Sequence, residues 1–234
     1  MAGVCRSFKK PVWHPSQWRS ISLYQKQQGA YAIQRADKGI ANLLNKAEHL
    51  QVLSLKFCPH VGDKTLTLIS DFANPFFFRE LYLDGCDNIT SLQNLVQNEG
   101  SINNKFLLEA HHSEIQISRF QALSLRKQDM KLLMEELSLG GARGLEVISL
   151  AECKGILDEG IKPLTQLKYL SKVILLGCLN IKNTGIKELA ESLQYLEEIK
   201  LGGTMIETQC LHDLVDLCLN LRRVNISGCK QLKE

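Results

Sequence analysis

Apolar and polar residues recur in one arrangement along most of the chain. Residues 145–153, LEVISLAEC, follow the template L-x-x-L-x-L-x-x-C, in which the last two leucine positions alternate with polar ones. This period of two predicts a short strand with one buried face. Segments of the same form begin at Leu50, Phe78, Phe120, Leu145, Leu170, Leu196 and Leu221, and those at Phe120 and Leu196 lack the cysteine. A recurring period of this length indicates a stacked repeat protein.

The middle and last leucine positions of each segment are the predicted core of one row of parallel strands. They are Leu53, Leu55, Leu81, Leu83, Leu123, Leu125, Ile148, Leu150, Val173, Leu175, Ile199, Leu201, Val224 and Ile226. Parallel pairing is expected because the chain between two strands must return to the same end of the sheet, which a helix can do.

Amphipathic helices are predicted between the strands. In residues 183–196, Ile186, Leu189, Ala190 and Leu193 fall on one helical face, and Asn183 or Thr184 is a plausible N-cap. The same spacing occurs in residues 62–73, 158–170 and 208–221. We therefore expect an α/β solenoid with parallel strands on the concave face and helices on the convex face.

Cysteines occupy the last position of the template in five segments. Of the eight in the chain, Cys58, Cys86, Cys153, Cys178 and Cys229 share this place, and Thr204 takes it once. A residue used once per repeat suits packing, as a small apolar side chain whose thiol can reach a neighbouring carbonyl. With no secretory signal pattern at residues 1–10, we expect reduced, buried thiols in a cytoplasmic and/or nuclear protein.

These segments resemble the cysteine-containing subfamily of leucine-rich repeats, whose consensus is roughly L-x-x-L-x-L-x-x-C-x-x-I-T-D-x-G-I. LKFCPHVGDKTL, LDGCDNITSLQNL, LAECKGILDEGI and LLGCLNIKNTGI match it. The resemblance covers residues 50–234 and implies a horseshoe-shaped solenoid, preceded by a linking repeat at 24–49. The step from Phe78 to Phe120 is 42 residues, so an insertion is expected near 93–119.

Residues 4–23, VCRSFKKPVWHPSQWRSISL, resemble the last part of an F-box, which sets a first unit at 1–23. Val4, Cys5, Phe8, Pro15, Trp18 and Arg19 match the motif. Phe8 replaces the usual tryptophan and Gln17 the usual leucine. The resemblance implies that the strand at the end of this segment begins the sheet. It also implies that Val4, Phe8, Trp13 and Pro15 face the adaptor of a cullin-type ubiquitin ligase, provided that a full F-box exists.

The first half of an F-box does not precede this segment, and the chain stops at SGCKQLKE, directly after a predicted strand. We expect a shortened gene product or a fragment of a longer protein, because a solenoid normally ends in a capping unit.

Composition argues against several other classes of function. A net charge of +3 with 23% charged residues is too weak to suggest a nucleic-acid or anionic-membrane partner. No apolar run approaches the length that spans a bilayer. The adjacent His111 and His112 lack the spacing of metal ligands, and no metal site, cofactor site or catalytic constellation is expected. The chain is predicted not to be an enzyme.

The concave face is the predicted binding surface, since side chains between the buried leucines point outward there. Its mixture of aromatic, aliphatic and charged groups fits a protein interface. The predicted partner-contacting residues are Tyr82, Arg126, Ile174, Leu176 and Lys200. The sequence predicts a substrate-recognition subunit of a cullin-type (SCF) ubiquitin ligase. The alternative is a leucine-rich-repeat scaffold or regulator that acts without an F-box.

Overall fold

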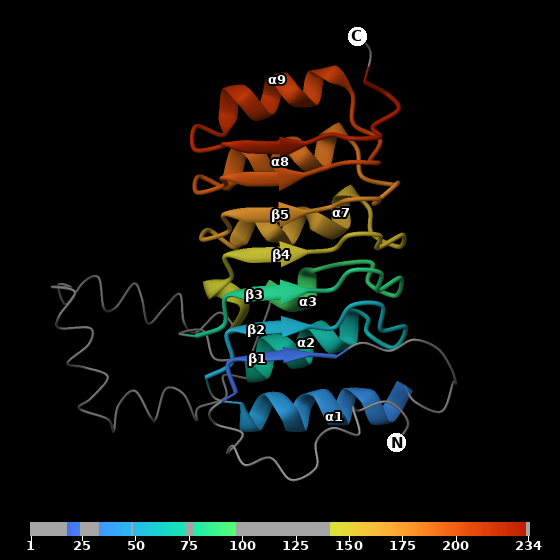
Figure 1. Ribbon diagram of the computed structural model, residues 1–234, viewed down its shortest axis with the longest axis vertical. Coiled ribbons are helices and arrows are strands. Elements are labelled where there is room, and N and C mark those ends of the chain that lie inside the picture. Colours follow the sequence, from blue (N-terminus) through green and yellow to red (C-terminus); the bar gives the residue numbers. More distant parts are fainter. Residues whose placement is uncertain (1–17, 24–32, 48, 74–76, 97–140, 233–234) are drawn as a thin grey trace, which may run out of the picture.

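Seven short strands form one parallel sheet in which each strand lies beside its neighbour in the sequence (Figure 1). The computed structural model describes residues 18–23, 33–47, 49–73, 77–96 and 141–232. The strands are β1 (Ser20–Ser22), β2 (Val52–Ser54), β3 (Glu80–Tyr82), β4 (Val147–Ser149), β5 (Lys172–Ile174), β6 (Glu198–Lys200) and β7 (Arg223–Asn225). The predicted row of parallel strands is confirmed, and it begins at Ser20 as the F-box resemblance implied.

Helices cover one face of this sheet and leave the other face open (Figure 1). They are α1 (Ile33–Lys46), α2 (Asp63–Phe72), α3 (Gln93–Val96), α7 (Asp158–Ile161), α8 (Asn183–Ser192) and α9 (Thr208–Leu217), with 3₁₀ turns η3 (Gly141–Gly144) and η4 (Lys162–Gln166). Each repeat is thus strand, turn and helix. The core lies between the two layers, where Leu81, Ile148, Leu150 and Val173 are fully buried.

β3 and β4 are direct neighbours in the described sheet, although the sequence predicted another strand between them. β3 pairs directly with β4, with Leu81 opposite Ile148, and the Leu83 N–H donates to the Ser149 carbonyl at 2.8 Å. These hydrogen bonds occupy the facing edges of both strands, so the two strands pair without another strand between them. Leu123 and Leu125 fall outside the described residues.

The prediction of a buried core also fails at the last strand. Val224 is 42% exposed and Ile226 is only partly buried. β7 is an edge strand of the described sheet and pairs only with β6. In a stacked solenoid an apolar side chain is covered from both neighbouring repeats, and here it is covered from one.

The helix expected over 158–170 is broken into α7 and η4. Pro163 stands at the start of η4 and has no N–H to donate to the carbonyl of Glu159. The chain therefore tightens from an α-helix into a 3₁₀ turn after Ile161.

Asn183 does not cap its own helix, contrary to expectation. Lys182 is the N-cap of α8, and Asn183 is the first helical residue. The Asn183 side-chain oxygen instead accepts the Glu207 N–H of the next repeat at 2.8 Å. Asp158 accepts the Lys182 N–H at 2.8 Å in the same way, so these side chains join successive repeats.

The residue before each cysteine position adopts a left-handed backbone conformation. Gly85, Gly177, Gly203 and Gly228 have φ between 65° and 75°, and Phe57 and Glu152 share the conformation with φ of 53° and 60°. Glycine is the residue that tolerates this region without strain. Glycine recurs before the cysteine position in the sequence, and this recurrence indicates the turn.

The side chain at the cysteine position links each repeat to the preceding one. Each thiol reaches the carbonyl of the preceding repeat's last strand leucine: Cys86 that of Leu55 at 3.2 Å, and Cys178 that of Leu150 at 3.0 Å. The seven cysteines among the described residues are all free and buried, as predicted.

Thiol labelling should therefore be slow in the native protein. Burial is the main cause that raises the pKa of Cys86 and Cys178 to about 12 and that of Cys153 to about 11, so these thiols stay protonated and unreactive at neutral pH. Native protein mixed with a thiol reagent should keep these residues unmodified until denaturant is added, as read by peptide mass mapping. Rapid native modification of most of them would contradict their buried position between repeats.

Candidate functional site

The candidate site is the open face of the sheet, here called the strand face. Its side chains alternate with the buried leucines and therefore point away from the helices. The parallel register aligns them in rows across the strands. The central row runs through Ser54, Tyr82, Ser149, Ile174, Lys200 and Asn225, and the row before it through Val52, Glu80, Val147, Lys172, Glu198 and Arg223.

The structure brings most of the predicted partner-contacting residues together. Ile174 and Lys200 are direct neighbours on β5 and β6, and Tyr82 lies on β3, separated from Ile174 by Ser149 of β4. Leu176 follows β5, where the Glu152 N–H donates to its carbonyl and continues the parallel ladder. Tyr82, Ile174, Leu176 and Lys200 are all half-buried.

Five predicted site residues fall outside the described part of the chain. Arg126 was expected on the strand face, but β3 and β4 pair without a strand between them. The residues expected to face an adaptor, Val4, Phe8, Trp13 and Pro15, precede the first described residue, Trp18. Their assignment stays a prediction.

A network around Asp84 organises the β2–β4 side of the strand face. Asp84 forms an ion pair with Lys56 at 2.8 Å and accepts hydrogen bonds from the Ser149 hydroxyl and, at 3.1 Å, from the Ala151 N–H. The Lys56 ammonium also lies 4.7 Å from the centre of the Tyr82 ring, a cation–π distance. Tyr82 is thereby held between charged neighbours rather than free to rotate.

The Tyr82 hydroxyl is fixed as a hydrogen-bond donor. It donates to a Glu80 carboxylate oxygen at 2.7 Å. Burial, followed by this hydrogen bond and the nearby charges of Glu80 and Asp84, raises the Tyr82 pKa to about 12. The Tyr82 hydroxyl is therefore protonated and neutral at physiological pH. The ring presents an apolar face, and the hydroxyl is already bonded to Glu80.

A second network surrounds Glu198 on the β5–β7 side. Three cations meet its carboxylate: Lys172 at 3.2 Å, Lys200 at 3.4 Å and Arg223 at 2.9 Å. Burial favours the neutral acid, but the hydrogen bond and charge of Lys172, the hydrogen bond of Lys200 and the charge of Arg223 outweigh it and lower the Glu198 pKa. Glu198 is therefore ionised at neutral pH.

Removing the Glu198 charge should make stability less sensitive to acid. A pKa lowered on folding gives stability that is complete above the unfolded-state pKa and is lost as pH falls through the folded-state pKa. Glu198→Gln should cost roughly 1 kcal/mol at neutral pH, typical of partly exposed ion pairs. Urea unfolding at neutral and acid pH should show this difference shrinking as pH falls. An unchanged difference would mean that Glu198 is not held by the three cations.

Asp84 and Glu198 are not among the residues that the sequence predicted to contact a partner. Both are buried on the strand face, with 9% and 7% exposure, because neighbouring side chains fold over them. A signal was present: Lys172, Glu198 and Arg223 occupy the same template position in successive repeats, which puts opposite charges side by side. Aligning the repeats is therefore enough to predict that Lys172 and Arg223 pair with Glu198.

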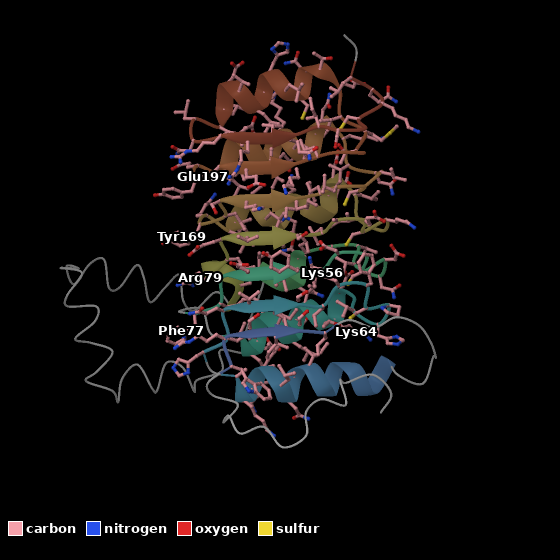
Figure 2. All side chains as sticks on the ribbon, in the orientation of Figure 1. Lys56, Lys64, Phe77, Arg79, Tyr169 and Glu197 are labelled. Atoms are coloured by element: carbon pink, nitrogen blue, oxygen red, sulfur yellow. The ribbon has the colours of Figure 1, made fainter. Side chains whose placement is uncertain are left out.

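The edge of the sheet where the strands begin carries a further set of side chains. Figure 2 shows Phe77, Arg79, Tyr169 and Glu197 along this edge and Lys56 on the opposite side. Arg79 pairs with Glu146 at 3.0 Å, and the rings of Tyr169 and Tyr195 stack at 6.5 Å between centroids. These contacts tie neighbouring repeats at the rim of the strand face.

The described residues carry neither a cluster of metal-ligand side chains nor a membrane-spanning helix. Within the described ranges, no three His, Cys, Asp or Glu side chains converge as ligands for a metal ion. No helix in the same ranges is long and apolar enough to cross a membrane. What the strand face presents is a fixed arrangement of apolar groups between charged ones.

Comparison with known proteins supports the architecture. No family model and no curated protein matches the chain. Among solved structures, the Rad7 and Elc1 complex from yeast contains a chain that matches with a TM-score of 0.51 and 16% identity over 82% of this chain. The chain spans 40% of the length of that protein. A TLR13–ssRNA13 complex matches at a TM-score of 0.36 and 12% identity, covering 95% of this chain and 35% of that one.

The fold is therefore a leucine-rich-repeat solenoid. Its parallel strands form one face and its helices the other, as the sequence predicted. At this level of identity the likeness extends to the fold alone, and function rests on the chain's own residues.

Proposed function

We propose that the chain is a protein-binding leucine-rich-repeat subunit, and that it serves as the substrate-recognition component of a cullin-type (SCF) ubiquitin ligase in the cytoplasm or nucleus. The observation that carries the binding role is the strand face itself. Tyr82, Ile174 and Leu176 present aromatic and aliphatic surface from a rigid sheet, between charges already held in place. A pre-ordered surface loses little conformational entropy when a partner docks.

The chain itself contributes no chemistry in this proposal. Its role is to hold a target protein near the catalytic subunits, which raises the effective concentration of the reacting groups. The solved structure that shares the fold is a complex of two proteins, Rad7 and Elc1, and this is consistent with a role in protein assembly. The ligase assignment rests on the F-box-like residues 4–23.

Affinity purification of the natural gene product, followed by mass spectrometry, tests both parts. We expect two classes of partner: a cullin adaptor and a target protein. A Val4→Asp with Phe8→Asp variant should lose the adaptor and keep the target. Recovery of a target without any adaptor would contradict the ligase role and leave the scaffold alternative.

A further inference from the structure

Charge is unevenly distributed along the strand face. On the strand face of β5–β7, the cations Lys172, Lys200 and Arg223 surround one carboxylate, Glu198. On the strand face around β2–β4, the cation Lys56 lies near two carboxylates, Glu80 and Asp84. The β5–β7 half therefore carries a net charge of +2 and the β2–β4 half a net charge of −1.

The positive charge of the β5–β7 half is concentrated at one point. Glu198 neutralises only one of the three cations that surround it, Lys172, Lys200 and Arg223. The Arg223 side chain is 71% exposed, and its Nη2 lies 2.9 Å from a Glu198 carboxylate oxygen. A guanidinium has five donors in a planar fork, so Arg223 can bind a second carboxylate without releasing the first.

Apolar surface adjoins this cationic cluster. Ile174 lies beside Lys200 in the central row. A Leu176 methyl group would lie 3.1 Å from a Cβ placed on Gly202, so the leucine lies close to the backbone that follows β6, at a position without a side chain. A ligand that contacts the cations would also contact Ile174 and Leu176.

We propose that the β5–β7 half of the strand face binds an acidic segment of a protein, in which Asp or Glu side chains flank an apolar residue. The apolar residue lies on Ile174 and Leu176, and the carboxylates meet Lys200 and Arg223. This inference rests on the proposed function, because it assigns a partner chemistry to the same face.

The observed charges favour a protein over a nucleic acid. A net charge of +2 is small beside the roughly six to ten phosphate contacts of a nucleic-acid site. A short peptide with a few carboxylates matches both the charge and the adjoining apolar surface.

Fluorescence anisotropy with synthetic peptides tests the inference on the purified chain. The probe is a short labelled peptide in which glutamates flank one leucine, and its two counterparts carry glutamine or lysine in place of glutamate. The glutamate peptide should bind more tightly than both. The double variant Lys200→Gln with Arg223→Gln should bind the glutamate peptide roughly tenfold more weakly, because two partly exposed ion pairs with the peptide are lost.

Glu198→Gln should have the opposite effect and strengthen binding. The variant frees Lys172, Lys200 and Arg223 from the internal carboxylate, a gain that a folding defect would not produce. The matched control, Lys182→Gln with Lys187→Gln, removes the same charge from exposed residues at the start of α8 and within it, and should leave binding unchanged.

Equal affinity for the glutamate and lysine peptides, no gain for Glu198→Gln, or tighter binding of a single-stranded RNA of similar length would overturn the inference. The proposed function fails differently. If the Tyr82→Ala with Ile174→Asp variant loses the natural target but the glutamate peptide does not bind, the proposed function stands and only the inference is overturned. If that variant retains the target, the proposed function is wrong.

Discussion

Leu150→Ala should lower the free energy of unfolding by about 2–5 kcal/mol, the cost of an unfilled cavity in a packed core. Leu150 is fully buried and follows β4, with repeats stacked on both sides. The Cys178 thiol also donates to its carbonyl, so the local packing has little freedom to collapse. Urea unfolding followed by circular dichroism measures the effect.

Val224→Ala is the matched control for this prediction. The side chain occupies the middle leucine position of the β7 template and is 42% exposed, so its truncation should cost less than about 1 kcal/mol. Equal costs at the two positions would mean that burial between repeats does not set the stability of the solenoid.

The double variant Tyr82→Ala with Ile174→Asp should abolish binding of the target protein identified by purification. Tyrosine is among the residues that dominate protein interfaces, and truncating such a residue costs at least about 2 kcal/mol of binding energy. An aspartate at position 174 adds an unpaired charge that a docked partner would bury at further cost. We expect affinity to fall by roughly a hundredfold or more, as measured by isothermal titration.

Neither substitution should unfold the protein, because both side chains are half-buried on the strand face and neither belongs to the packed core. The melting temperature should stay nearly constant. Lys187→Ala with Glu191→Ala, on the exposed side of α8, should leave binding unchanged. Weaker binding in the α8 variant alone would show that the partner uses the helical face.

Much of the architecture could be predicted because the repeat template records it directly. Alternation at Leu81 and Leu83 specifies a strand with one buried face, and the same pattern returns in register at Val173 and Leu175. The cysteine position was read correctly for the same reason, since its contact to a neighbouring carbonyl repeats from Cys86 to Cys229.

The features that escaped prediction depend on neighbours that a single segment does not show. The exposure of Val224 follows from the position of β7 at the edge of the described sheet, although its template matches the others. Two segments after β3 match the strand template, one at Phe120 and one at Leu145. Apolar periodicity does not show which of the two pairs with β3, and in the structure the partner is β4.

The candidate site could be predicted in outline but not in its electrostatics. Alternation placed Tyr82, Ile174 and Lys200 on one face, which the structure confirms. Burial of Asp84 and Glu198 arises from side chains of adjacent strands closing over them, so it required the register. Arg126 falls outside the described residues, so its position on the strand face stays a prediction.

Site-specific photo-crosslinking tests most directly the claim that the strand face binds a protein. A photoreactive amino acid is placed at Ile174 in one protein and at Glu191 in another, and each is irradiated with the target. We expect a covalent adduct from position 174 and none from position 191, because the two side chains lie on opposite faces of the sheet–helix stack. An adduct from position 191 with none from position 174 would contradict the account.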